Sequence, residues 1–279
     1  MSFRMARATQ PVTKSRRNLP TEFLYDVFAL IVSVIVVHAV YVTAIRPNAE
    51  ADLAQQAEMM RADPNFVPER SLYVILKDYE QEACFILMLW AFAIMAYKGV
   101  ATRRERALLA SELVHVPDGM RILPEDTREY ARQVEALEPE TRRLLLPRAV
   151  MAALSRFGAT RNIQDVSEAA HGVCQSEADR LDSELSMVRY IAWAIPAIGF
   201  IGTVRGIGDA LSQAHKAVTG DIAGVTAGLG TAFNSTLIAL LISIVIMFLL
   251  HQLQLAQERL VLETETWLDQ NLLRHMQVR

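Results

Sequence analysis

Four apolar stretches of about twenty residues constrain the fold of this chain more than any other feature of its sequence. The core of a membrane offers no water to backbone polar groups, so stretches of this length favour helices that satisfy those groups internally. The second stretch is the weakest, because its wholly apolar part runs only from Ala83 to Tyr97, and a buried helix of a soluble domain is the alternative there. The stretches lie at residues 24–45, 79–97, 190–208 and 225–250.

The composition agrees with a membrane protein. Hydrophobic residues make up 52% of the chain, and the mean hydropathy is +0.20. The first stretch exceeds the roughly 7–15 residues of a signal-peptide core, so we expect a retained anchor, with cleavage near Asn48 as the alternative. The two cysteines lie in dissimilar surroundings and predict no disulfide framework. The sequence therefore predicts an all-α integral membrane protein with four transmembrane helices.

Basic residues in the short flanks set the predicted orientation. The first twenty residues contain no acid, and their bases are Arg4, Arg7, Lys14, Arg16 and Arg17. Lysine and arginine near membrane spans favour the cytoplasmic side, which makes residues 1–23 a basic cytoplasmic N-terminus. Residues 46–78 and 209–224 then form outer loops, and residues 98–189 and 251–279 lie inside. The segment after the second span agrees, because it opens with Lys98, Arg103, Arg104 and Arg106.

The two predicted inner segments carry helical apolar spacing. Asn162 is a candidate N-cap, with Asp165 in the first turn, for a helix that continues straight into the third span. Its apolar stripe consists of Ile163, Val166, Ala170, Val173, Leu181, Leu185 and Val188. The tail after His251 repeats this pattern, so the fourth span is expected to continue as a long helix. We interpret both stripes as helix packing surfaces and predict long cytoplasmic helical extensions.

Small residues distinguish the third and fourth stretches from the first two. Gly202, Gly206 and Ala210 follow one another at four-residue spacing in and just after the third stretch. The corresponding ridge of the fourth consists of Gly224, Gly228, Ala232 and Thr236. Because lipid tails are as apolar as leucine, helices associate in a membrane through close packing, which such ridges permit. We therefore expect these two spans to pack tightly.

Polar side chains also lie deep in these two spans: Thr203, Asn234, Ser235 and Thr236. An unsatisfied polar group is costly there, so each needs a partner or water. In one interpretation each threonine hydroxyl bonds a carbonyl in the preceding turn of its own helix. In the other, the groups line a water-accessible path for a cation or for a carboxylate from another chain.

Two motifs in these spans resemble those of the MotA/TolQ/ExbB proton channel family. Residues 195–207 read IPAIGFIGTVRGI and are similar to the family pattern of a proline followed by G-[LF]-x-G-T-V-x-G-I. Residues 228–240 read GLGTAFNSTLIAL and are similar to G-L-x-x-A-F-x-T-T-L-x-A-L. The resemblance covers roughly residues 160–265. The first two spans match in layout alone, and that layout is similar to the four-span flagellar-stator type.

The resemblance implies an assembly and a set of site residues. Five copies of the channel subunit would surround a dimer of a single-span subunit like MotB, TolR or ExbD, whose aspartate carries the ion. The absence of a deeply placed acid in the predicted spans agrees with this arrangement. Thr203 and Thr236 match the threonines that face the partner aspartate, and Pro196 matches the proline of the same span. Ser235 stands where many relatives have threonine, and Asn234 where some have aspartate, which leaves proton and sodium open as the conducted ion.

Arg205 departs from the family pattern, which is often aromatic at this position, and is expected to snorkel or to pair with Asp209 at the outer end of its span. His38 lies within the first span and is interpreted as a packed neutral imidazole, with titration in a polar interface as the alternative. The six histidines show no metal-ligand spacing, and no phosphate loop, nucleophile elbow or dinucleotide motif is present. We expect no enzyme activity, no metal or cofactor, and no nucleic-acid partner.

The sequence thus predicts an energiser or stator subunit of the bacterial inner membrane, with both termini cytoplasmic, that couples proton flow to mechanical rotation. Sodium is the alternative ion. A transporter that works alone and a non-conducting membrane scaffold are the alternative functions.

Overall fold

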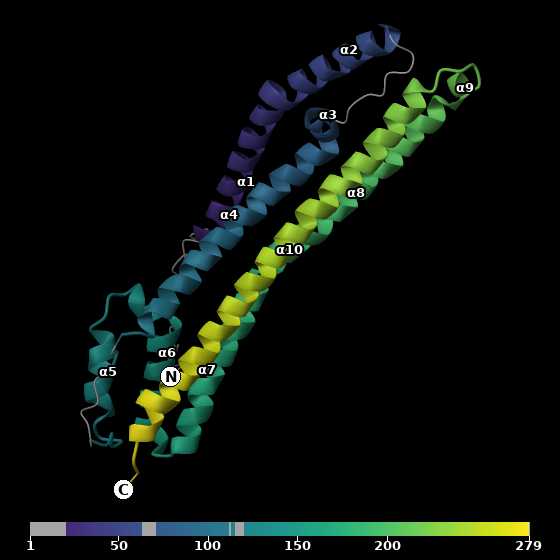
Figure 1. Cartoon of the computed structure of the whole chain (residues 1–279). Coiled ribbons are helices and arrows are strands. Elements are labelled where there is room, and N and C mark those ends of the chain that lie inside the picture. Colours follow the sequence, from purple (N-terminus) through teal and green to yellow (C-terminus); the bar gives the residue numbers. More distant parts are fainter. Residues whose placement is uncertain (1–20, 63–70, 112, 115–119, 279) are drawn as a thin grey trace, which may run out of the picture.

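The computed structural model describes residues 21–62, 71–111, 113–114 and 120–278, which form an elongated arrangement of helices (Figure 1). The predicted basic segment at residues 1–20 lies outside the described residues. Four described segments are long and apolar enough to cross a membrane: Phe23–Ala62, Tyr79–Leu108, Ile163–Ser212 and Ala223–His275. The predicted class, an all-α integral membrane protein with four transmembrane helices, is confirmed.

The first two spans form an antiparallel pair that is tied together by hydrogen bonds to the backbone. The indole Nε1 of Trp90 donates to the carbonyl of Asp26 over 2.9 Å, and the Tyr25 hydroxyl donates to the carbonyl of Ala93 over 3.1 Å. The elements of this half are α1 (Thr21–Val40), a π turn η1 (Tyr41–Ile45), α2 (Arg46–Ala62), α3 (Leu72–Leu76) and α4 (Tyr79–Leu108).

Residues 46–62, expected in a loop, continue the first helix as α2. This segment is rich in alanine, glutamate, glutamine and methionine, which favour helix even without an apolar stripe. The π turn ends two residues before Pro47, whose ring nitrogen has no hydrogen to donate to a carbonyl of the preceding turn. The backbone N–H of Arg46 instead bonds the carbonyl of Tyr41, which allows the helix to pass the proline.

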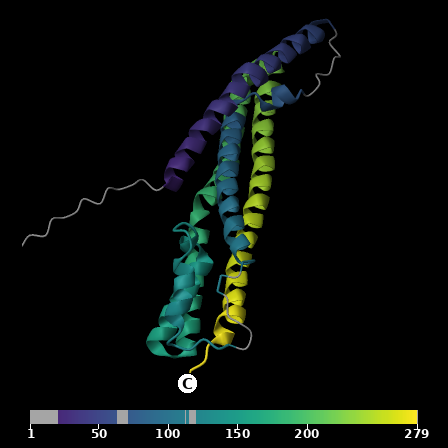
Figure 2. The same cartoon turned by 90° about the vertical axis from the view of Figure 1, so that its left-hand side faces the viewer.

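The last two spans lie side by side over most of their length in both views (Figures 1 and 2). As predicted, α7 (Ile163–Glu184) leads directly into α8 (Ser186–Ser212), and the Asn162 side chain caps α7 by accepting from the backbone N–H of Gln164 over 2.9 Å. After the short α9 (Ala214–Ala217), α10 (Ala223–Asn271) runs without interruption for 49 residues. The predicted continuation of the fourth span as a long helix is therefore observed.

A second helical unit, here called the head, lies at one end of the bundle (Figure 1). It combines α5 (Thr127–Glu135), α6 (Leu145–Thr160), most of α7 and the end of α10, with the short turns η2 (Thr141–Arg143) and η3 (Leu273–His275). Its core includes Leu154, Phe157, Val166, Leu268 and Leu272. A separate core holds the bundle of α4, α8 and α10, and includes Ile94, Leu185, Ile195 and Ile246. The opposite end of the bundle, near α3 and α9, is called the distal end.

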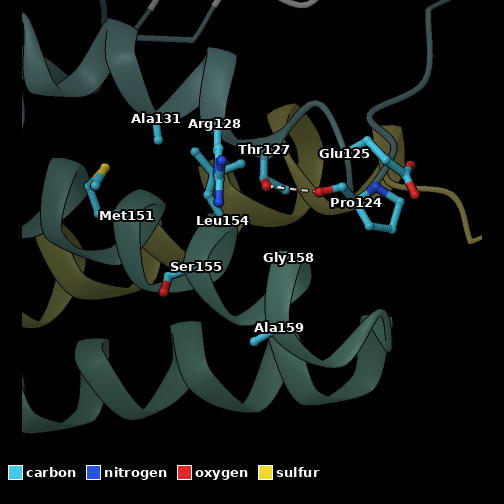
Figure 3. Close-up of a pocket in the computed structure, with 10 residues that line it drawn as sticks. All are labelled: Pro124, Glu125, Thr127, Arg128, Ala131, Met151, Leu154, Ser155, Gly158 and Ala159. Atoms are coloured by element: carbon cyan, nitrogen blue, oxygen red, sulfur yellow. Dashed lines mark hydrogen bonds between the residues drawn. The ribbon is translucent and has the colours of Figure 1, made fainter.

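The head contains an open cavity of about 700 Å³ between α5 and α6 (Figure 3). Met151, Leu154 and Ala131 provide apolar walls. The Thr127 hydroxyl at its edge donates to the carbonyl of Pro124 over 2.9 Å and so closes the turn before α5.

Candidate functional site

The two glycine-rich helices approach so closely that side chains would not fit between them. A Cβ atom added to Gly206 of α8 would lie 2.5 Å from the backbone nitrogen of Ala232 and 2.5 Å from the carbonyl oxygen of Gly228. A Cβ added to Gly228 would lie 2.6 Å from the backbone nitrogen of Ala210. Gly202 is equally constrained by the side chain of Ser235. At these positions α8 packs closely against α10.

Gly224 differs from the other predicted packing residues. A Cβ added there would meet the side chain of Gln213, 2.8 Å away, near the turn that follows α8. The ridge on α10 therefore contacts α8 through Gly228 and Ala232, while its first member packs against the connection at the distal end.

Thr203 of α8 and Thr236 of α10 form a hydroxyl pair between the helices. The Thr203 hydroxyl also lies 3.1 Å from the carbonyl of Ala232 on α10, and the Thr236 hydroxyl donates to the carbonyl of Gly199 on α8 over 3.0 Å. The bond from Thr203 back to its own helix, at 3.4 Å, is the longest of the set. Both hydroxyls thus bond mainly across the interface, unlike the local bonding that one sequence interpretation offered.

Ser235 and Asn234 do not share this geometry. The Ser235 hydroxyl is buried and donates to the carbonyl of Thr231 in its own helix over 2.8 Å, so here the local interpretation applies. Asn234 is half-buried and lies two positions before Thr236, which places the two side chains on different faces of α10. The structure therefore brings together Thr203 and Thr236, with Ser235 beside Gly202, but not Asn234.

Pro196 has a partner that sequence analysis missed. A proline inside a helix cannot donate to the carbonyl four residues earlier, which here belongs to Ala192. The Ser243 hydroxyl of α10 donates to that carbonyl over 3.1 Å. Ser243 therefore replaces the missing backbone donor. In the sequence, this contact is indicated only by the position of Ser243, which lies two turns after Thr236 on the same predicted helix.

Arg205 makes its main ion pair with an acid on another span. Its guanidinium donates two bonds of 2.7 Å to the carboxylate of Glu80 on α4, whereas the predicted partner Asp209 lies 3.8 Å away. The pairing with Asp209 thus exists, but it is the weaker contact. Sequence spacing could not reveal Glu80, because the bidentate bond joins residues 125 positions apart.

These observations define a multi-pass membrane protein whose last two spans form a close-packed pair with hydroxyl groups at its centre. Residues 142–266 match the sequence profile of the MotA/TolQ/ExbB proton channel family. The matched segment includes α7, α8 and most of α10. The comparisons with curated proteins and with solved structures returned no match. This family consists of channel and motor subunits rather than enzymes.

Proposed function

We propose that this chain is the ion-conducting subunit of a motor complex, in which protons cross the membrane past Thr203 and Thr236 while bound transiently to an aspartate of a single-span partner. Sodium is the alternative ion. The observation that carries the proposal is the hydroxyl pair Thr203–Thr236, which joins the two motifs of the proton channel family at one point of the α8–α10 interface. Thr203 and Thr236 are both half-buried in the single chain, which agrees with a pair that a second chain contacts.

The assembly in this proposal is five copies of the chain around two copies of the partner. Large apolar side chains of α8 and α10 are exposed in the single chain, including Phe200, Val204, Phe233 and Leu237. Such side chains need lipid or neighbouring subunits in a membrane. Basic residues near the head side of the spans support a head in the cytoplasm of a bacterial cell and a distal end in the periplasm.

A charge change at the partner aspartate would supply the motion. A carboxylate in a low-dielectric site is strongly disfavoured, and protonation removes that charge. The partner helix could then move relative to the ring until the proton is released on the inner side. Thr203 and Thr236 act in this proposal as hydrogen-bond partners that position the carboxylate of the partner aspartate.

Native mass spectrometry of the complex, extracted gently from its host membrane with a tag on this chain, tests the assembly. Five copies of the chain with two copies of a small single-span protein would support the motor. A monomer, or a ring without a partner, would favour the transporter or the scaffold instead.

Substitution of the hydroxyl pair tests the mechanism. Thr203→Val and Thr236→Val should each abolish ion-driven work and leave the complex assembled. Thr266→Val is a matched control, because Thr266 lies on the same helix as Thr236 but bonds the carbonyl of Leu262 on the exposed surface of the head. A scaffold would keep its activity in all three variants, which would contradict the proposal.

A further inference from the structure

A buried carboxylate joins the first and second spans near the distal end. The Glu82 side chain of α4 is only 8% exposed, and its Oε1 lies 2.7 Å from Nδ1 of His38 on α1. Its other oxygen accepts from the guanidinium of Arg46 at the start of α2. The Arg46 guanidinium also stacks over the ring of Tyr79, 4.3 Å from its centroid. The buried carboxylate of Glu82 is thus held by two basic side chains of the first membrane-spanning segment, one on α1 and one on α2.

The π turn explains how His38 and Arg46 reach the same carboxylate. In a regular α-helix, residues eight positions apart lie about 80° apart around the axis. The π turn at Tyr41–Ile45 takes up one additional residue, so the two side chains are related as if about seven positions apart, close to two full turns. The turn therefore aligns His38, Tyr41 and Arg46 on the face that packs against α4.

Three buried polar atoms beside this ion pair lack a hydrogen-bond partner among the described residues: the Tyr41 hydroxyl, Oδ2 of Asp78 and Oε1 of Gln81. Their residues are 1%, 9% and 0% exposed. Tyr41 packs against Phe85 of α4, and Asp78, Gln81 and Phe85 follow one another on one side of the start of that helix. Buried polar groups normally bind water or protein, so this region has the chemistry of a hydrated site.

The same turn of α4 also reaches the α8–α10 interface. Glu80 binds Arg205, and its Cγ lies 3.2 Å from the position of a Cβ at Gly202, next to Thr203. Arg205 lies 3.9 Å from the other oxygen of Asp78. The start of α4, which carries Glu82, therefore also carries Asp78 and Glu80, and both contact Arg205 close to Thr203.

We propose that His38 and Glu82 form a proton-exchange site within the membrane, with bound water at Tyr41, Asp78 and Gln81. An ionisable residue in a membrane span is costly and marks ion pathways more often than packing, and histidine exchanges protons near physiological pH. His38 is the exchanging group: its side chain is 59% exposed, while Glu82 is already paired with Arg46. Proton uptake converts the neutral imidazole to imidazolium, held by the Glu82 carboxylate, and release restores the neutral ring.

The use of this site for transport rests on the proposed function, in which it lies on the side where protons enter. Several charged or titratable groups act near the pair, on each element packed against it. On α1 to α2 these are His38, Tyr41 and Arg46, and on the segment from α3 into α4 they are Lys77, Asp78, Tyr79, Glu80, Glu82 and Cys84. Arg205 is the contribution of α8.

Nuclear magnetic resonance of the full chain with isotopically labelled histidine, in lipid nanodiscs, tests the site directly. His38→Gln identifies the His38 signal among the six histidines. We expect this signal to convert reversibly between the neutral and the imidazolium form as the pH is varied, and Glu82→Gln to change that conversion, because the neighbouring negative charge is lost. Glu82→Asp keeps the charge and should restore the behaviour of the unmodified chain. A His38 signal that stays neutral at every pH at which the protein is folded would overturn the proposal.

The chain offers a matched control in the head. His171 lies 2.8 Å from Glu265, a similar distance, on the exposed surface. Its signal should be unaffected by the Glu82 variants, which shows that the head of those variants is folded. If a variant alters the His171 signal, the titration of the unmodified chain, assigned by His38→Gln, decides the question.

Ion-driven work of the assembled complex separates this inference from the proposed function. His38→Gln should lower the rate several-fold and flatten its dependence on external pH, with the partner still bound. If His38→Gln leaves the rate and the pH profile unchanged while Thr203→Val abolishes the work, the exchange site is overturned and the proposed function stands. A titrating His38 in a protein that conducts no ion would leave the exchange site and overturn the proposed function.

Discussion

Replacement of Gly206 by alanine should destabilise the membrane bundle, because the added methyl group meets backbone on two sides. Its Cβ would lie 2.5 Å from the Ala232 nitrogen and 2.5 Å from the Gly228 carbonyl oxygen, where ordinary contacts begin at 3.4 Å. The helices would therefore have to separate by about 0.9 Å, since a backbone cannot rotate away as a side chain can. Overpacking of this kind costs about 1–3 kcal/mol.

Thermal unfolding of the purified protein in detergent, followed by the loss of the monodisperse species, measures this cost. A loss of about 2 kcal/mol corresponds to a fall in Tm of roughly 4–8 °C for a chain of this size. Gly208→Ala is the matched control, because a Cβ at this position on the same helix has no neighbour within 4 Å. Alanine there improves helix propensity and should not lower Tm. Equal Tm values for Gly206→Ala and Gly208→Ala would refute the close-packing argument.

Three further substitutions test individual contacts. Ser243→Ala should cost about 1 kcal/mol of unfolding free energy, because it removes the donor to the Ala192 carbonyl. In a Pro196→Ala background the backbone N–H at position 196 returns, so the same substitution should cost much less. Additive effects of the two substitutions in unfolding experiments would contradict this. Asn162→Ala should cost about 1 kcal/mol through the lost N-cap, which thermal unfolding of the head would detect. Arg205→Lys should cost about 1 kcal/mol or less, because its 42% exposed side chain loses only a bidentate geometry; a larger fall in Tm would mean that the ion pair is less screened than its exposure indicates.

The number and type of the spans could be predicted from the sequence, because a membrane imposes length and polarity on each segment separately. The direct passage from α7 into α8 and the cap at Asn162 followed from local patterns as well. The helical α2 did not, because a polar helix without an apolar stripe looks like a loop when periodicity is the main signal. Helix propensity and the compensating π turn before Pro47 decided its conformation.

Some parts of the candidate site could likewise be predicted from the sequence, and others could not. The small residues and the two threonines were visible as motifs, since each motif lies on a single helix. The partners that complete the site come from elsewhere: Ser243 bonds a carbonyl freed by Pro196, and Glu80 binds Arg205. These contacts depend on how the helices are rotated against one another, which spacing along one segment does not determine. No deeply placed acid was therefore expected in the spans, although Glu82 of the second span is buried against α1.

The single helix α10 links the hydroxyl pair mechanically to the head. It carries Thr236 in the bundle and Thr264, which is fully buried, in the head, and no glycine or proline lies between them. At about 1.5 Å per residue, the two threonines are roughly 42 Å apart along one continuous hydrogen-bonded helix. By contrast, the path from Thr203 to the head crosses Pro196 and the turn at Leu185. An axial displacement of α10 at Thr236 must therefore move the head, whereas the path through α8 and α7 can bend at two places. The head follows α10, and the load of the proposed motor should be sought on the surfaces that this helix positions.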